Sequence, residues 1–234
     1  MLLTAEELEI LRLSLRVAFW SVLISLPLAI AVALLLARSD FPGKSLFDAV
    51  VHLPLVLPPV VVGYLLLVTM GRHGPIGALL EQWFGLVLIF KWTGAALAAG
   101  IMGFPLMVRA IRLSFESIDL KLEAAARTLG ANRTRVFLSI TLPLALPGIL
   151  TGMLLSFARS LGEFGATITF VSNIPGETRT LPLAIYTYTQ VPSGDAAALR
   201  LSLIAVALSL AALFVSELMV RRATKRIMGH DAER

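Results

Sequence analysis

Long apolar blocks restrict the fold of this chain more than any other feature of its sequence. An α-helix needs about 20 residues to cross the hydrocarbon core of a bilayer, and five blocks are at least that long. We therefore predict membrane-spanning helices at residues 10–37, 50–70, 93–113, 137–158 and 199–220. The composition agrees, because 57% of the residues are hydrophobic and 15% are charged, whereas a soluble domain carries about 25% charged residues. The predicted fold class is an all-α integral membrane protein in which residues 1–234 form one transmembrane domain.

The segment at residues 163–198 decides whether the chain has five spans or six. Its apolar stretches are interrupted by polar residues, prolines and a glycine, so we interpret it as an outer loop that can dip into the membrane. With five spans and an outer N-terminus, most basic residues fall in the inner loops and the C-terminal tail, as the positive-inside rule requires. A sixth span would put the two most basic segments on opposite faces. We therefore expect the N-terminus outside and the C-terminus in the cytoplasm.

Prolines and glycines occur unusually often within these spans or at their ends. A proline frees a backbone carbonyl, which in a bilayer must be satisfied by a neighbouring helix or by water. Gly148 and Gly152 form a GxxxG pair that lets another helix approach closely. These residues favour a bundle with a cavity or with moving parts. The prolines concerned are Pro27, Pro54, Pro58, Pro59, Pro105, Pro143 and Pro147.

The composition gives no support for several other kinds of site. Cysteine is absent, so the chain has no disulfide and no thiolate ligand for a metal. The three histidines are scattered without the spacing of metal ligands, and we expect His52 to be a hydrogen-bonded packing residue. The net charge of +5 is explained by basic inner loops and does not indicate a nucleic-acid partner.

The inner loop at residues 117–136 carries the most specific pattern of the sequence. Asp119 is placed to cap a helix, and Gly130 is placed to end it with a positive φ. Between them, Leu122, Ala125, Ala126 and Leu129 recur at helical spacing and form an apolar stripe. The pattern predicts a short amphipathic helix on the cytoplasmic surface, which must bury its stripe against lipid headgroups or against a partner protein.

This loop resembles the EAA loop of ABC importer permeases, in which a small-residue pair precedes a glycine and, after a fixed gap, the motif I-x-L-P. Ile140, Leu142 and Pro143 supply that last motif here. The family's glutamate usually stands where this chain has Ala124, and the carboxylate is one place earlier, at Glu123. The resemblance implies a coupling helix that docks in a groove of an ATPase subunit. The docking residues would be Leu122, Glu123, Ala124, Ala125, Ala126, Leu129 and Gly130.

Longer stretches are similar to the permeases of molybdate importers, notably HLPLVLPPVVVGYLLL at 52–67 and FARSLGEFGATITFVSNIPGETRT at 157–180. This resemblance implies a type I ABC permease bundle in the bacterial inner membrane, with transport activity and no catalytic site of its own. The implied partners are a second copy of the chain, two ATP-binding cassette subunits and a soluble molybdate-binding protein. The chain would need no cofactor, since ATP and Mg²⁺ bind to the ATPase. The RSLGEFGA segment is shared with sulfate and tungstate permeases, which remain alternative functions.

Arg159 and Glu163 stand at the outer end of the fourth predicted span, four residues apart on one helical face if the helix continues that far. One hypothesis is that Arg159 guides a divalent oxyanion, with Thr167 and Thr169 as hydroxyl donors. The alternative is an interfacial arginine that locks a gate or docks the binding protein.

An ion-coupled secondary transporter is a competing class of function. It would require an intramembrane carboxylate, and the spans offer few, with Asp48 and Glu217 near helix ends.

Overall fold

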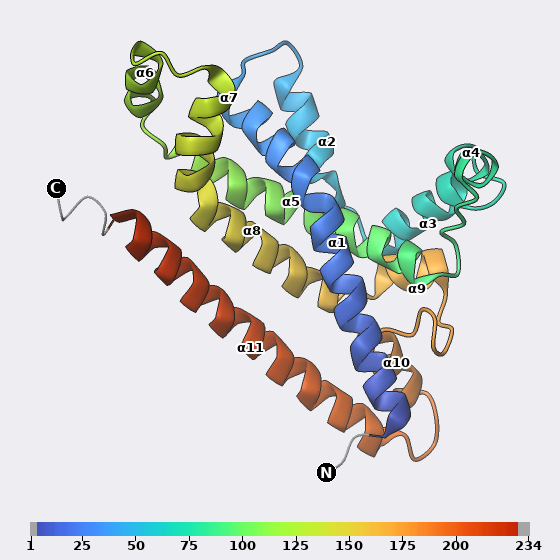
Figure 1. Ribbon diagram of the computed structural model, residues 1–234. Coiled ribbons are helices and arrows are strands. Elements are labelled where there is room, and N and C mark those ends of the chain that lie inside the picture. Colours follow the sequence, from blue (N-terminus) through green and yellow to red (C-terminus); the bar gives the residue numbers. More distant parts are fainter. Residues whose placement is uncertain (1–3, 229–234) are drawn as a thin grey trace.

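The computed structural model describes residues 4–228, which fold as helices and connecting loops without a strand (Figure 1). The prediction of an all-α chain is confirmed. The helices are α1 (Ala5–Arg38), α2 (Lys44–Val56), α3 (Pro59–Met70), α4 (Pro75–Phe84), α5 (Trp92–Glu116), α6 (Leu120–Thr128), α7 (Arg133–Val136), the π-helix η1 (Phe137–Thr141), α8 (Leu142–Leu161), α9 (Gly165–Val171), α10 (Leu181–Thr189) and α11 (Asp195–Met228).

Four helical segments of the described chain are long and apolar enough to cross a membrane. A fifth candidate is the pair α2 and α3, whose axes are bent by 111°. The first three are longer than the apolar blocks that predicted them, because polar residues extend the helices beyond the apolar part, and the fourth begins four residues before its block. The four segments are Ala5–Arg38, Trp92–Glu116, Arg133–Leu161 and Asp195–Val215.

The structure differs from the prediction of one continuous helix at residues 50–70. Leu57 and Pro58 are both extended, with ψ of 141° and 132°. Each of them precedes a proline, and the ring of a following proline disfavours the helical conformation. Pro59 then begins α3 at a position where its missing N–H costs nothing. The hydropathy of the block predicted a span, but the Pro58-Pro59 pair divides it into two helices that run in different directions.

Helix α5 lies at the centre of the bundle and packs along α1 and α8. The contact with α8 is close because small residues face each other. A Cβ atom added at Gly148 would lie 2.2 Å from Ser114 Cβ, and one at Gly152 would lie 2.9 Å from the Met107 carbonyl oxygen. The expectation that this glycine pair allows a close helix approach is confirmed. Buried contacts of this kind stabilise the bundle through van der Waals packing.

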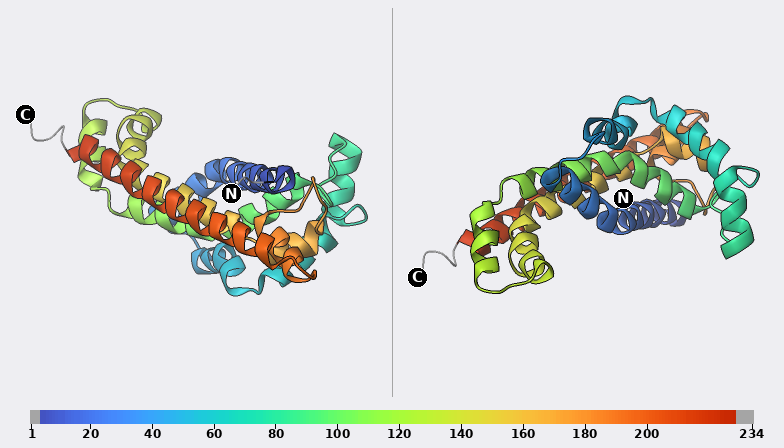
Figure 2. Two further views of the ribbon diagram at one scale, coloured as in Figure 1. Left: turned by 90° about the horizontal axis from the view of Figure 1, so that it is seen from below. Right: turned by 90° about the horizontal axis from the view of Figure 1, so that it is seen from above.

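The two ends of the bundle carry different elements (Figures 1 and 2). Helix α6 lies at one end, whereas the start of α1, helix α10 and the start of α11 lie at the other end. Arg200 of α11 holds this second end together, because its Nη2 lies 2.7 Å from Oε1 of the buried Glu7. The segment predicted as an outer loop, residues 163–198, contains the short helices α9 and α10, and α9 packs against α3 and α5.

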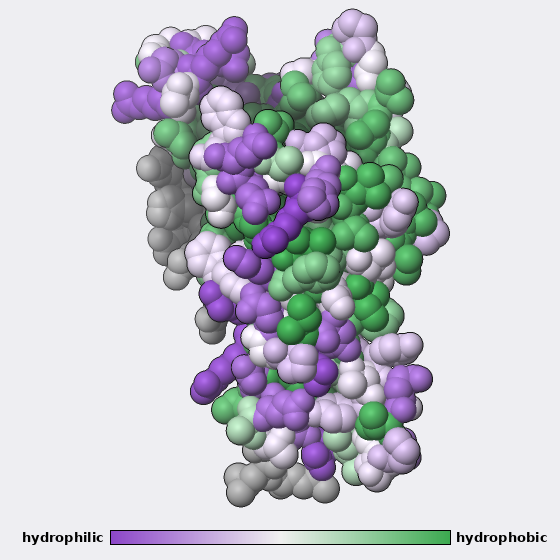
Figure 3. Space-filling view, turned by 90° about the vertical axis from the view of Figure 1, so that its right-hand side faces the viewer, coloured by the Kyte–Doolittle hydropathy of each residue, from purple (hydrophilic) through white to green (hydrophobic). Residues whose placement is uncertain are grey.

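The surface is consistent with a protein that spans a membrane. On the face drawn in Figure 3, hydrophilic residues gather at the two ends and in a band across the middle, and hydrophobic residues fill much of the rest. Helix α11 exposes Leu199, Leu203, Leu210 and Phe214. In water such large exposed apolar surfaces would promote aggregation, whereas lipid chains cover them without cost.

Candidate functional site

The helix predicted at the inner loop is present as α6, with the caps that the sequence indicates. The Asp119 side chain accepts a hydrogen bond from the Lys121 N–H at 2.9 Å, and Gly130 has a φ of +86°. The Gly130 N–H donates to the Arg127 carbonyl at 3.0 Å and closes the last turn. A helix of nine residues is too short to be stable alone. It therefore depends on these caps and on contacts with the rest of the chain.

Three of the four residues of the predicted apolar stripe of α6 face away from the bundle. No residue of α6 is buried, and Leu122 is 49% exposed. Ala125 and Leu129 are exposed on the same side, while Ala126, the fourth residue of the stripe, is half-buried at the edge next to the half-buried Glu123. The described chain therefore leaves most of the stripe uncovered. The predicted docking residues lie together in one short helix and its C-terminal turn, as their spacing indicated.

Glu123 points in the opposite direction, toward its own chain. Its Oε1 accepts a hydrogen bond from Arg38 Nη2 at 2.8 Å and another from the Thr141 hydroxyl at 3.0 Å. The Glu123 side chain is 13% exposed. Arg127, one turn away, lies at 3.8 Å from the other carboxylate oxygen and adds a weaker attraction. The carboxylate that the resemblance assigned to partner docking thus connects α6 to the end of α1 and to the start of the next span.

The connection to that span passes through an irregular stretch of helix. Thr141 ends the five-residue π-helix η1, and it is buried. A π-helix widens the backbone ring, and single turns of this kind inside α-helices often occur at functional sites. Pro143 follows in the first turn of α8. The carboxylate of Glu123 is therefore bonded to a buried residue in the irregular stretch of the long helix.

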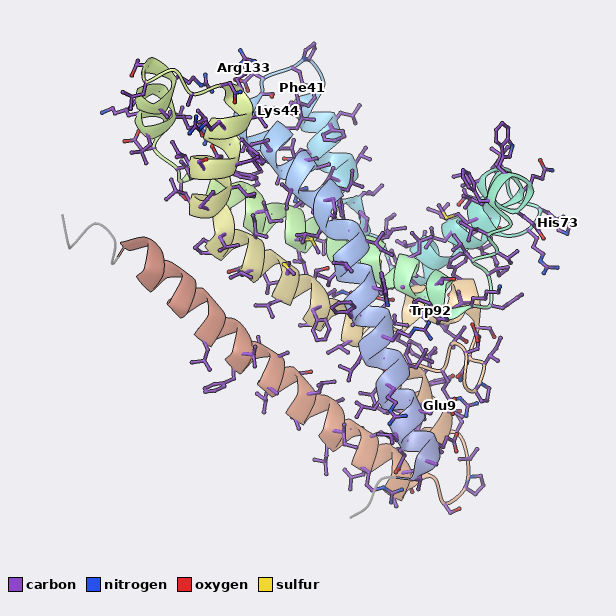
Figure 4. The ribbon with its side chains drawn as sticks, viewed as in Figure 1. Glu9, Phe41, Lys44, His73, Trp92 and Arg133 are labelled. Atoms are coloured by element: carbon purple, nitrogen blue, oxygen red, sulfur yellow. The ribbon has the colours of Figure 1, made fainter. Side chains whose placement is uncertain are left out.

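A cavity of about 700 Å³ lies between α6, the end of α1 and the segment α7–η1. Its charged lining residues are Arg38, Arg127 and Arg133 together with Glu123, so cations outnumber carboxylates there. Figure 4 shows Arg133 at the same end of the molecule as Phe41 and Lys44, beside the loop between α1 and α2. The face next to α6 is consequently basic and suits an acidic or phosphate-containing partner surface.

The second predicted site lies at the other end of α8. Arg159 Nη1 is 2.6 Å from Glu163 Oε2, although the helix ends two residues before Glu163, at Leu161. The other oxygen, Oε1, accepts a hydrogen bond from the Ala166 N–H at 2.8 Å, so Glu163 also holds the start of α9. Glu163 is 1% exposed and Arg159 is 27% exposed. The structure brings this pair together, with the arginine partly accessible.

The two threonines proposed as anion donors lie in α9 but do not converge with the ion pair to form an open site. Thr167 is buried. The Thr169 hydroxyl donates to the Gly165 carbonyl at 2.8 Å, so its hydrogen is used within the helix. Helix α3 lies directly against this turn, since a Cβ at Gly63 would lie 2.6 Å from the Ala166 carbonyl oxygen. Contact of these residues with a translocated anion remains a prediction.

Sequence reasoning missed a polar cluster between α2 and α5. Arg112 Nη1 lies 3.0 Å from Asp48 Oδ2, and Arg112 Nε lies 2.7 Å from Glu116 Oε1. The His52 ring nitrogen Nδ1 lies 2.9 Å from the Asp48 carbonyl oxygen, which confirms the expected hydrogen-bonded role of His52. The i, i+4 spacing of Arg112 and Glu116 was a usable signal. Nothing local indicated Asp48, which is 64 positions away in sequence from Arg112.

Within the described part of the chain, no group of acidic or histidine side chains is arranged to hold a metal ion.

Comparison with known proteins gives consistent matches over nearly the whole chain. The family model described as "Binding-protein-dependent transport system inner membrane component" matches residues 9–225. The "Molybdenum transport system permease protein ModB" of Escherichia coli (strain K12) is 62% identical over 226 residues, which are 97% of this chain and 99% of that protein. The protein of the same name from Haemophilus influenzae is 61% identical over 221 residues, covering 94% of this chain and 96% of the relative.

A solved structure gives the same fold at low sequence identity. It is a bacterial alginate ABC transporter in complex with an alginate pentasaccharide-bound periplasmic protein. The matching chain has a TM-score of 0.75 and 20% identity, and the alignment covers 95% of this chain and 81% of that one. At this identity the match establishes the arrangement of the helices and nothing more specific.

Proposed function

This chain belongs to the family of binding-protein-dependent transport system inner membrane components, and from that premise we propose that it is the permease subunit of an ATP-driven importer of molybdate. The observation that supports molybdate as the cargo is the 62% identity to a molybdenum transport permease, which extends over 97% of this chain. The exposed apolar helices support a location in the membrane. Transport by such a subunit involves no covalent chemistry of its own, and ATP and Mg²⁺ bind to a separate ATPase.

The exposed stripe of α6 supports docking to that ATPase. A short helix with small and apolar residues on one side fits a groove in a partner protein and then moves with it as a rigid unit. The arginines of the neighbouring cavity add a basic rim to the same surface. Two copies of the chain would form the pathway, two ATPase subunits would drive it, and an outer binding protein would deliver the anion. In this arrangement the N-terminus lies outside and the C-terminus in the cytoplasm.

Glu123 transmits the motion of α6 to the bundle. When ATP closes the two ATPase subunits, each α6 moves with the groove that holds it. The Glu123 carboxylate then displaces the end of α1 through Arg38 and the π-helix through Thr141. A charge-assisted hydrogen bond is stronger than a neutral one, so it carries force between elements that have few other contacts. The irregular helix η1 absorbs the change in direction between α6 and α8.

At the outer end, the ion pair of Arg159 and Glu163 holds the junction of α8 and α9. Movement of α8 changes the position of Arg159, while Glu163 stays bonded to α9. This junction would act as the outer gate, with the partly exposed guanidinium facing the anion that enters. Opening would separate α9 from α3, which touch at Gly63.

The cargo is tested by competition in vesicles that contain the complete importer. Uptake of radiolabelled molybdate is measured with unlabelled molybdate, tungstate or sulfate in excess. Molybdate should compete fully, and sulfate should compete weakly. Strong and equal competition by sulfate would instead indicate a sulfate permease of the same group.

A further inference from the structure

The inner half of α5 carries charged residues on a face that α2 covers only in part. Arg109, Arg112 and Glu116 follow one another at helical spacing, and Asp48 faces them from α2. Arg109 lies seven residues before the end of α5, which corresponds to about 10 Å along the helix. A charge costs about 2.5–3.5 kcal/mol at the bilayer centre, and four charges so close together in the inner half of a span favour a face that borders water or another protein over one that borders lipid chains.

Two cavities meet at this face and share Arg109 and Leu113 in their linings. One, of about 320 Å³, lies between α2 and α5 and contains the ion pairs of Arg112. The other, of about 490 Å³, lies between α5 and α8 and is lined by Ser114 and Thr151 as well as apolar residues. Because they share two lining residues, the two cavities are adjacent, and together they are called the hollow.

Among the residues whose side chains the structure describes, Arg109 is the cation of this hollow that has no partner. Both carboxylates of the cluster are bonded to Arg112, at 3.0 Å for Asp48 and 2.7 Å for Glu116. Arg109 is exposed and makes no hydrogen bond or ion pair with any other described residue. By contrast, Arg159 at the outer end is already paired with Glu163 at 2.6 Å. A guanidinium without a protein partner retains all of its donors for an oxyanion.

We propose that the hollow between α2, α5 and α8 is a water-filled inner vestibule of the permease, and that Arg109 contacts the oxyanion there on its way to the cytoplasm. This proposal rests on the proposed function for the identity of the anion. The planar guanidinium fits two oxygens of a tetrahedral oxyanion in a bidentate contact. A single cation at an accessible site attracts the anion without holding it tightly, so release into the cytoplasm remains fast.

The test uses the absence of cysteine from this chain, because the substitution Arg109→Cys then introduces its one thiol. The importer, complete with ATPase, is labelled in vesicles whose cytoplasmic face is outward. Cationic and anionic methanethiosulfonate reagents that do not cross the membrane are applied, and the label on the permease is measured. For the uptake measurement the labelled importer is then reconstituted in the opposite orientation, with the binding protein and molybdate outside and ATP inside. Leu210→Cys is the matched control, because Leu210 is 61% exposed on α11, away from the hollow.

We expect the thiol of the Arg109→Cys variant to react with both reagents and the thiol of the Leu210→Cys variant to react with neither. Molybdate uptake by Arg109→Cys should fall by about tenfold or more, the factor that accompanies 1.4 kcal/mol of lost interaction. The cationic reagent should restore most of that uptake, and the anionic reagent should not.

Two results would overturn the proposal. Labelling at position 109 no faster than labelling at position 210 would refute the vestibule. Equal effects of the two reagents on uptake would refute the anion contact. Uptake by the unmodified importer tests the proposed function separately, because the labelling result does not depend on which anion is carried.

Discussion

Replacing Glu123 by glutamine should uncouple ATP hydrolysis from transport while leaving the importer assembled. Glu123→Gln keeps the size of the side chain but removes the charge that binds Arg38 at 2.8 Å and Thr141 at 3.0 Å. A hydrogen bond to a charged group contributes about 1.5–3 kcal/mol. Both side chains keep some contact with solvent, since Glu123 is 13% exposed and Arg38 is 19% exposed. We therefore expect the substitution to remove about 1–2 kcal/mol of interaction free energy between α6 and the two residues that it contacts.

The assay combines co-purification of the ATPase, ATP hydrolysis and uptake, measured for Glu123→Gln, Arg38→Gln and the double variant. Because the two residues act through one contact, the double variant should lose little more uptake per ATP than either single variant. Asp40→Asn is the control at the same end of the bundle. Its partner Lys44 lies at 3.0 Å, but Asp40 is fully exposed, and such surface pairs contribute little. Additive losses for Glu123 and Arg38, or normal coupling in Glu123→Gln, would refute the role of this contact.

Three further predictions concern docking, the outer pair and packing. Leu122→Asp places a charge in the stripe of α6 and should abolish co-purification of the ATPase by an otherwise folded permease; normal co-purification would show that α6 does not dock there. Arg159→Ala should lower molybdate uptake and leave assembly with the ATPase intact, and unchanged uptake would argue against a role in the pathway. Gly63→Val adds atoms where a Cβ would already lie 2.6 Å from the Ala166 carbonyl oxygen. The overpacking should cost about 1–3 kcal/mol of folding free energy, seen as a lower midpoint of thermal unfolding of the purified importer. An unchanged midpoint would contradict the close contact of α3 and α9.

Local features of the fold were predictable because neighbouring residues determine them. Asp119 and Gly130 marked the two ends of α6 correctly, since capping depends on side chains within a few positions. The pair of Arg159 and Glu163 was also visible from its spacing. The break at Pro58 was present in the sequence, but hydropathy averaged over a window does not register a change in backbone direction, so a single span was predicted.

Contacts between distant segments were not predictable in this way. Arg38 and Glu123 are 85 positions apart, and no residue near Arg38 in the sequence indicates this partner. The inward orientation of Glu123 depends on where the end of α1 lies relative to α6. Arg109 likewise had no local signal, because its lack of a partner among the described residues follows from Asp48 and Glu116 both binding Arg112. Such features require the packed bundle.

The most direct test of the proposed function is ATP-dependent uptake by purified components. This chain is reconstituted into lipid vesicles with its ATPase, and the binding protein and radiolabelled molybdate are supplied on the outer side, with ATP on the other. We predict accumulation of molybdate that requires ATP, the ATPase and the binding protein together. Accumulation by this chain alone, driven by an ion gradient and independent of ATP, would contradict an ATP-driven importer and indicate a secondary transporter.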